Sequence, residues 1–356
     1  MSNKRQPGSG KRGATVKDVA REAGVSAMTV SRVINGKANV RPATAEKIKR
    51  AIRKINYQPN VSARLLSSKR TYQFLMLYDN PNVGWMGELL IGMMNSCRRV
   101  GYHLVIEAVG SFDRQAVDSE LDPGELARLI DDSRIDGIIL PPPVCFNQTV
   151  LDVINQQGIP CVRMAGTPMQ DIQLRVSIDN RAAGYEVTRH LIGLGHTSIA
   201  IIKGPEEFAA SDLRFQGFME AMQQHGLMVP ESNVTTGLFD VQSGYACARE
   251  LLRQSNRPSA IFASNDEMAA GTLAAAQELK IDIPEQLSVA GFDDAPIARS
   301  IWPKLTTVRQ PLRAMGEKAV ALLEQHLRHA GDNIDETPQA FALLDYELIV
   351  RQSTAT

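Results

Sequence analysis

Beyond Thr71, short apolar runs alternate with helix-length segments, and this alternation constrains the fold more than any other feature of the sequence. Each run is long enough for one strand, and a polar or glycine-rich turn precedes the helical stripe that follows most of them. Such alternation is typical of parallel sheets covered by helices on both faces. The predicted strands are Phe74–Tyr78, His103–Ile106, Gly137–Leu140, Cys161–Met164, Ile199–Ile202, Ala260–Ala263 and Leu287–Gly291.

The charges of this 356-residue chain are sorted by position, although its formal net charge is zero. Residues 1–70 hold 17 Lys or Arg against only Asp18, Glu22 and Glu46, so the rest of the chain carries the matching excess of negative charge. A basic segment can neutralise phosphates, whereas nucleic acid repels an acidic one. We therefore expect the first 70 residues to bind DNA and the remainder to do something else.

Three short amphipathic helices are predicted in the basic segment. Apolar residues recur at helical spacing over Thr15–Ile34, with one break, and again over Ala45–Ile55. Thr15 and Ser26 can cap the first two helices, and Gly24 can adopt the left-handed conformation that ends the first. The short connection around Gly24 is typical of a helix-turn-helix unit.

The second of these helices is the candidate for a major groove, because its polar side presents Ala27, Met28, Ser31 and Arg32. Arg32 can form two hydrogen bonds with a guanine, and Ala27 and Met28 can touch a thymine methyl group or exclude a wrong base. The alternative is a basic but merely solvated surface. Predicted phosphate contacts, which hold the register without reading sequence, are Thr29, Asn35, Asn39 and Thr44.

Several stretches of this segment share one dense pattern. They are Thr15-Val16-Lys17-Asp18-Val19-Ala20, Ala23-Gly24-Val25-Ser26, Thr29-Val30-Ser31-Arg32-Val33-Ile34-Asn35 and Asn56-Tyr57-Gln58-Pro59-Asn60. They resemble the headpiece of the lactose-repressor/galactose-repressor (LacI/GalR) family of bacterial regulators, and the similarity continues at lower density to the C-terminus. The resemblance implies the following DNA-binding set: Thr15, Ser26, Ala27, Met28, Thr29, Ser31, Arg32, Asn35, Asn39, Tyr57, Asn60, Ala63 and Leu66.

Residues 61–67 span about two helical turns, which is too short for a stable free helix. Ala63-Arg64-Leu65-Leu66 resembles the hinge helix of the same family. The resemblance implies that two such helices, one per subunit, pack in the minor groove and that Leu66 wedges into the central base step. An ordinary linker is the alternative.

Polar and aromatic residues follow the predicted strands, where open parallel sheets bind their ligands. Aspartate, asparagine and arginine can bond to adjacent hydroxyls, and an aromatic face can cover the apolar side of a sugar ring. Carbohydrate is therefore the predicted effector. The resemblance also assigns effector contacts to Arg214, Phe239, Asn265 and Asp293. The full predicted ligand set is Tyr78, Asp79, Asn80, Trp85, Arg214, Phe239, Asn265, Asp293 and Gln310.

Structural roles remain open for most of this set. Arg214 can be a surface ion-pair partner, Asn265 or Asp293 a helix cap, Phe239 a core residue, and Trp85 a plug at the subdomain edge. Apolar residues at two other strand ends, Pro141-Pro142-Pro143 and Met164, predict a wider or less polar wall there than in some relatives, which suits a disaccharide or longer glycan.

No motif predicts an enzyme, a cofactor or a metal site. The adjacent carboxylates Asp293 and Asp294 should point in different directions, unlike a glycosidase pair. His326 and His329 lack a third ligand at metal-site spacing. Neither a phosphate-binding loop nor a nucleophile elbow is found. The four cysteines lie far apart, as expected of core thiols in a reducing compartment.

The predicted fold is a small all-α helix-turn-helix DNA-binding domain followed by an α/β core with two doubly wound, parallel-sheet subdomains, resembling periplasmic binding proteins. The predicted domains are a flexible basic arm (1–13), a headpiece (14–59), a hinge (60–72) and the core (73–356). Within the core, the N-subdomain is expected at about 73–176 and 308–335, and the C-subdomain at about 177–306 and 338–356.

The predicted function is that of a transcriptional repressor. It is expected to bind a pseudo-palindromic operator as a homodimer and to respond to a sugar or oligosaccharide. We expect it in the bacterial cytoplasm at the nucleoid, without a membrane segment. Leu89, Met93 and Met94, in the helix expected over Gly84–Val100, belong to an apolar stripe that predicts either a dimer surface or packing within the subunit. A periplasmic sugar receptor without DNA function is the alternative, and the basic segment argues against it.

Overall fold

The computed structural model describes residues 14–34, 40–55, 57, 70–79, 82–109, 122–164, 174–331 and 340–355. The chain divides into two compact units, residues 1–71 and residues 72–356. None of the helices in the described ranges combines the length and apolar character needed to span a bilayer.

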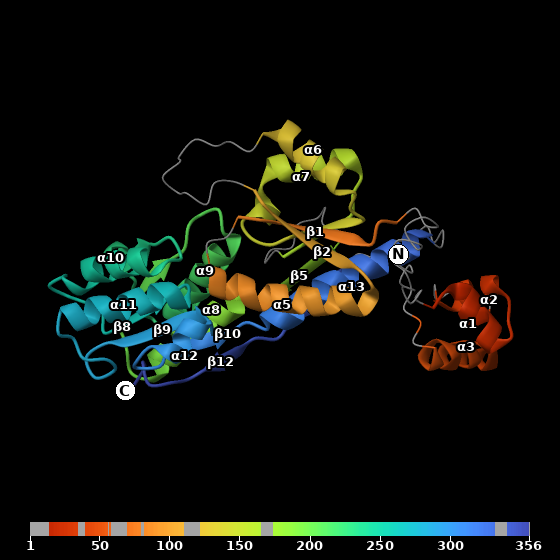
Figure 1. The fold of residues 1–356 in the computed structure, drawn as a ribbon. Helices are drawn as coiled ribbons and strands as arrows, with labels where there is room; N and C mark the ends of the chain where they lie inside the picture. The colour runs from red at the N-terminus through yellow and green to blue at the C-terminus, as the bar shows by residue number, and fades with distance from the viewer. Residues whose placement is uncertain are drawn as a thin grey trace, which may run out of the picture. The chain divides into compact units, whose positions relative to one another are not determined.

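The first unit contains three helices, coloured red to orange in Figure 1: α1 (Val16–Ala23), α2 (Ala27–Ile34) and α3 (Pro42–Lys54). They pack around Val19, Val30 and Ile48, which are fully buried. The predicted roles of Gly24 and Ser26 at the helix ends are confirmed. Gly24 ends α1 with a φ of 59°, and Ser26 Oγ accepts a hydrogen bond from the amide of Thr29 at 3.1 Å.

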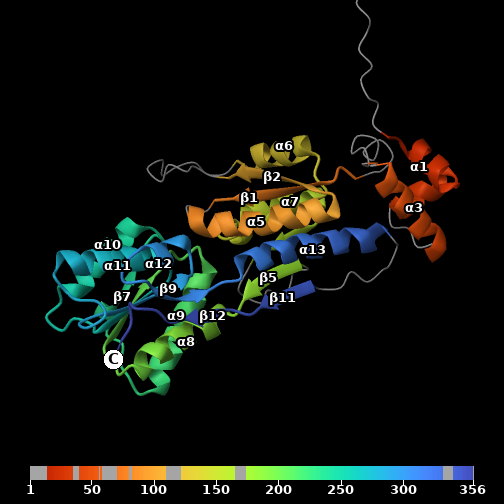
Figure 2. The same ribbon diagram turned by 60° about the horizontal axis from the view of Figure 1, so that its bottom comes forward.

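The first sheet of the larger unit has the order β11-β5-β4-β3-β1-β2, and all its strand pairs are parallel. Helices α5 (Val83–Val100) and α13 (Leu312–Gly331) cover one face, and α6 (Pro123–Ser133) and α7 (Gln148–Gln157) cover the other (Figure 1). Figure 2 shows α5 and α13 side by side. The strands are β1 (Gln73–Tyr78), β2 (His103–Ala108), β3 (Gly137–Leu140), β4 (Cys161–Arg163), β5 (Leu174–Ile178) and β11 (Ala340–Leu344).

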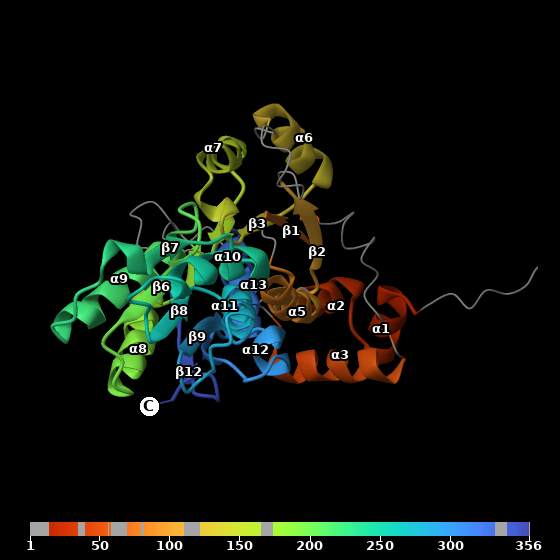
Figure 3. The same ribbon diagram turned by 90° about the vertical axis from the view of Figure 1, so that its left-hand side faces the viewer.

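The second sheet has the order β12-β10-β9-β8-β6-β7, parallel except for the antiparallel pair of β12 with β10. Helices α8 (Asn180–Gly193) and α9 (Ala209–Gln224) pack together, as do α10 (Val241–Leu252) and α11 (Asp266–Glu278) (Figure 3). The short helix α12 (Pro296–Ser300) follows β9. The strands are β6 (Ile199–Lys203), β7 (Val234–Thr236), β8 (Ala260–Ala263), β9 (Ser288–Asp293), β10 (Thr306–Arg309) and β12 (Glu347–Ile349).

Alternation of side chains explains why both faces of these sheets are covered. In β1, Phe74 and Met76 lie in the cluster formed with α5 and α13, whereas Leu75 and Leu77 lie in the cluster formed with α6 and α7. All four are fully buried. A strand that is apolar on both sides is stable only between two helical layers, as the sequence predicts.

The subdomain boundaries differ from the predicted ones. The chain passes from the first sheet to the second after Ile178, returns after Arg309, and passes again between Leu344 and Glu347. The prediction that residues from 338 onward belong to the C-subdomain is wrong for β11, which pairs with β5 in the first sheet. A short edge strand beside a crossing has no distinctive pattern, because only its hydrogen-bonded neighbour shows to which sheet it belongs.

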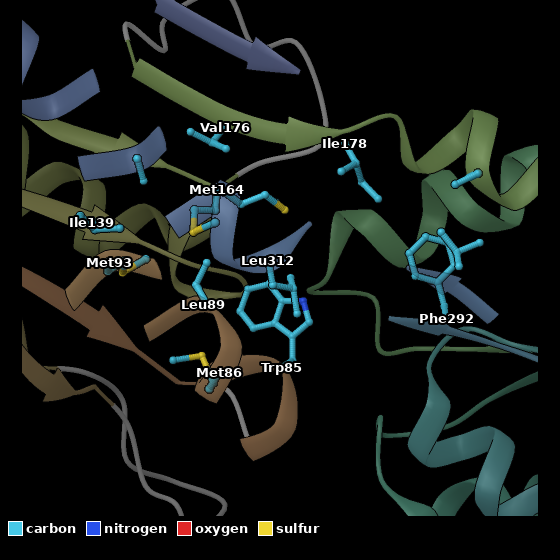
Figure 4. Packing of buried hydrophobic residues seen from close by; sticks show 14 of the residues in the cluster. Trp85, Met86, Leu89, Met93, Ile139, Met164, Val176, Ile178, Phe292 and Leu312 are labelled. Carbon is cyan, nitrogen blue, oxygen red and sulfur yellow. The ribbon is translucent and has the colours of Figure 1, made fainter. Parts of the chain in front are cut away.

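The apolar stripe of α5 packs mainly within the subunit. Leu89, Met93 and Cys97 are buried in the cluster shared with α13 (Figure 4). The alternative of internal packing therefore holds for these three side chains. Ile91 and Met94 remain exposed on the same helix.

Candidate functional site

A pocket of about 660 Å³, part of it open to solvent, lies between the two subdomains of the core. Its lining includes residues at or just beyond the carboxyl ends of β4, β5, β8, β9 and β10. The predicted ligand residues that line it are Trp85, Arg214, Phe239, Asn265, Asp293 and Gln310.

Two other predicted ligand residues, Tyr78 and Asp79, are not among the described residues that line this pocket. Tyr78 ends β1, and Asp79 follows it at the surface. Asn80 lies outside the described residues. The expectation that ligand residues lie just after the strands was therefore more accurate for the second sheet than for Tyr78 and Asp79 of the first.

Arg214 lies at the centre of the polar wall and is only 6% exposed, so it is not a surface ion-pair partner. Its Nε donates to Asn180 Oδ1 at 3.0 Å, and its Nη1 donates to the carbonyl of Ser264 at 2.5 Å. The guanidinium carbon lies 3.6 Å from the centre of the Phe292 ring. Burial lowers the pKa of Arg214 to about 10, and the nearby carboxylates of Asp293 and Asp266 oppose this effect. The group therefore remains a cation at neutral pH.

Asp293 ends β9 with a φ of 114°, a backbone conformation that side-chain-bearing residues rarely adopt. One of its carboxylate oxygens accepts a hydrogen bond from Gln310 Nε2 at 2.6 Å. Burial raises the pKa of Asp293 to about 6, although Arg214 and Gln310 lower it. Asp294 turns away, as predicted, and accepts from Arg309 and Arg351. A carboxylate has acceptor capacity beyond one hydrogen bond, so Asp293 can also receive a ligand hydroxyl.

Asn265 and Phe239 are linked to each other and to the fold. The side-chain oxygen of Asn265 caps α11 by accepting from the amide of Met268, and its Nδ2 donates to the carbonyl of Phe239 at 3.0 Å. The helix-cap alternative for Asn265 therefore holds together with its place in the pocket. Phe239 has a φ of 60° and meets Phe208 edge to face, with ring centres 5.0 Å apart.

The opposite wall is largely apolar. Trp85 is 8% exposed and packs in the core cluster that contains Leu89 and Leu312 (Figure 4). Pro142 and Met164, predicted to make this wall less polar, both line the pocket. Pocket residues that the sequence did not reveal are Asn82, Phe146, Ser177, Asn180, Phe208, Ala210 and Met315.

Close packing of α8 against α9 positions Arg214, and a matched pair of glycines in α8 tests this. A Cβ at Gly184 would lie 2.4 Å from the backbone oxygen of Arg214, whereas one at Gly193 would meet no atom within 4 Å. We expect Gly184→Ala to lower the free energy of unfolding by about 1–3 kcal/mol and to weaken ligand binding, because α9 must shift. Gly193→Ala should be neutral or stabilise by up to about 1 kcal/mol. Urea denaturation of both variants measures this, and equal stabilities would contradict it.

In the first unit, α2 presents an exposed side that carries most of the predicted base contacts. Ala27 and Arg32 are exposed, and Met28 is 67% exposed although it is apolar. Ser26, Thr29 and Ser31 lie on the same helix or just before it.

The remaining predicted DNA contacts are not all supported. Tyr57 is 7% exposed and belongs to the core of the first unit, so the structure favours a packing role for it. Thr15 precedes α1 and donates from its amide and hydroxyl to Asp18, and these hydrogen bonds lower the pKa of that carboxyl group. Candidates that lie outside the described residues are Asn35, Asn39, Asn60, Ala63 and Leu66.

Comparisons with known proteins match both units. Residues 15–60 match the family described as bacterial regulatory proteins, lacI family, and residues 188–354 match the periplasmic binding protein-like domain. The chain is 33% identical to the HTH-type transcriptional repressor PurR of Haemophilus influenzae, over 96% of this chain and 98% of that protein. It is 34% identical to the ribose operon repressor of Escherichia coli, over 87% and 92%.

A solved structure described as a transcriptional regulator CelR-cellobiose complex also resembles the chain. It has a TM-score of 0.71 and 30% sequence identity, and the similarity covers 96% of this chain and 99% of the other.

Proposed function

Since the chain belongs to the LacI family of bacterial regulatory proteins, we propose that it is a transcriptional repressor whose operator affinity is set by a sugar bound between the core subdomains. The family relationship supports the DNA-binding repressor. The sugar and the residues that bind it are inferred from the pocket between the subdomains.

The observation that supports a sugar is the combination of polar and aromatic side chains around the pocket. Arg214, Asp293 and Gln310 offer fixed donors and acceptors on one side, as a row of hydroxyls requires. Trp85 and Phe239 offer aromatic surface for the C–H face of a ring. The similar regulator solved with cellobiose makes a disaccharide the first candidate.

A thermal-shift screen of the full chain against cellobiose, ribose and other mono- and disaccharides tests this part of the proposal. A ligand that binds only the folded state raises the melting temperature. We expect at least one sugar to do so, and nucleobases serve as planar comparators because aromatic side chains also stack on them. A response to nucleobases alone would replace the sugar in the proposal.

The DNA-binding part of the proposal uses residues 14–59 as the headpiece and 60–72 as a hinge, in a homodimer on a pseudo-palindromic operator. It is supported by the basic charge of this segment and by the exposed polar side of α2. Phosphate contacts would supply affinity, and the exposed side of α2, which includes Arg32, would supply sequence preference.

Replacing Arg32 with alanine should separate these two contributions. We expect a loss of about 1–3 kcal/mol on an operator selected from random DNA, and a much smaller loss on unrelated DNA, because a base contact is removed. Arg21→Ala in α1 is the control, since that side chain is 79% exposed and pairs with Asp18. Fluorescence anisotropy measures both affinities, and an equal loss of affinity on the two DNAs would assign Arg32 to phosphate.

A further inference from the structure

One carboxylate in the core accepts hydrogen bonds from both subdomains. Oε2 of Glu267, near the start of α11, accepts from Nδ2 of Asn82 at 2.9 Å and from Nδ2 of Asn265 at 2.9 Å. Asn82 directly precedes α5 of the N-subdomain, and Asn265 directly precedes α11 of the C-subdomain. A single side chain therefore joins the two helix starts that border the pocket.

The orientations of both amides are fixed by other hydrogen bonds. Asn82 Oδ1 caps α5 by accepting from the amide of Trp85 at 2.9 Å, and Asn265 Oδ1 caps α11 by accepting from Met268. If either amide were flipped, its NH2 group would face a backbone N–H donor. Both Nδ2 groups therefore point at Glu267, and a carboxylate, which only accepts, matches two donors.

The surroundings of Glu267 are tight and carry little positive charge. A Cβ built on Gly84 would lie 3.7 Å from Glu267 Oε1 and 3.4 Å from Pro296 Cδ, so the start of α5 lies directly against α11 and α12. Within the described part of the chain, no Lys or Arg lies at ion-pair distance from this carboxylate. Burial, and then the charge of Asp293, raise the pKa of Glu267 to about 7. Hydrogen bonds from the backbone at Glu267 itself and from the Asn82 side chain lower this pKa and so oppose these effects.

We propose that Glu267 is a latch that holds the two subdomains together at the pocket by binding Asn82 and Asn265 at once. The latch positions the Trp85 wall against the wall that carries Asn265 and Phe239. This inference deepens the proposed function, because the latch sets how readily the pocket opens. Its test needs no ligand and no DNA, so its failure can be distinguished from failure of the proposed function.

Trp85 provides the signal for this test. The sequence contains two tryptophans, and Trp302 is 77% exposed, so Trp302→Phe leaves Trp85 as the single tryptophan fluorophore at little structural cost. Trp85 is buried beside the latch, and its amide is held by Asn82. Opening the subdomains should expose the indole, shift its emission to longer wavelength and increase its quenching by acrylamide.

In the Trp302→Phe background, we expect Glu267→Met to increase the quenching constant of Trp85 about twofold or more, because it removes the oxygen that accepts from both amides. Asn82→Asp should do the same, since it faces one carboxylate with another while keeping an oxygen to cap α5. Adding Glu267→Gln to Asn82→Asp replaces the facing carboxylate with an amide, which can donate to the carboxylate introduced at position 82. This double variant should therefore be quenched less than Asn82→Asp alone.

Glu278→Gln at the far end of α11 is the matched control and should leave quenching unchanged. Circular dichroism melting confirms that each variant is folded. If Asn82→Asp does not fold, recovery of a folded double variant still supports the latch, and failure to recover overturns it. Parental quenching in folded Glu267→Met and Asn82→Asp variants, or a folded double variant quenched as strongly as Asn82→Asp alone, would also overturn it. A thermal-shift titration of the parent with cellobiose tests the proposed function separately.

Discussion

Replacing Arg214 with alanine is expected to lower the affinity for the sugar effector by about 100-fold or more. Hydrogen bonds to charged groups contribute about 1.5–3 kcal/mol each, and about 1.4 kcal/mol corresponds to tenfold in affinity. The side chain also lies over Phe292 and opposes the effect of burial on Asp293. Its removal therefore alters the remaining polar wall as well. Isothermal titration with a sugar that raises the melting temperature measures the change.

Arg214→Lys is the control for charge alone. It keeps the cation but cannot reproduce both the hydrogen bond to Asn180 and the one to the carbonyl of Ser264, so we expect an intermediate loss. DNA affinity without effector should be unchanged in both variants. Parental sugar affinity in a folded Arg214→Ala protein would place the binding site elsewhere.

A fragment that begins at Tyr72 is expected to lose sequence-specific DNA binding by about 10³-fold or more, the usual interval between specific and non-specific affinity. Residues 1–71 form a separate compact unit, and residues 1–70 hold 17 of the 39 basic residues. The fragment keeps an excess of negative charge, which DNA repels. Anisotropy with a labelled operator measures the loss.

The same fragment should still show the sugar-dependent rise in melting temperature, because the pocket lies wholly within residues 72–356. This result serves as the control that the fragment is folded. Retained operator recognition by the fragment would contradict the assignment of DNA binding to the basic segment.

Most of the core could be predicted because its strands are apolar on both faces. Runs such as Phe74–Tyr78 and Ala260–Ala263 leave few alternatives to a buried parallel strand, and both form strands in the structure. Residues 340–344 were misassigned, because Phe341 and Leu343 are exposed on an edge strand. Exposure weakens the pattern, and pairing with β5 is a long-range property.

In the pocket, too, local sequence patterns identified some residues, whereas contacts between distant parts of the chain were missed. Arg214 and Asp293 could be found because they lie within a family-like segment or at a strand end, and both positions are local in sequence. Asn82 and Glu267 were missed, because their contact joins residues 185 positions apart. The one local signal was that Glu267 extends the polar pair Asn265-Asp266. For Tyr57, which the resemblance placed among the DNA contacts, the fold adds that the ring packs in the core of the first unit.

The most direct test of the account is the operator affinity of the full chain, measured with and without a saturating concentration of the sugar found in the screen. Coupling between two sites commonly amounts to about 1–3 kcal/mol, so we expect the dissociation constant to change by about 5-fold or more in one direction. The change should disappear in Arg214→Ala. If the parent protein binds both the operator and the sugar and the operator affinity stays the same, the central claim is contradicted.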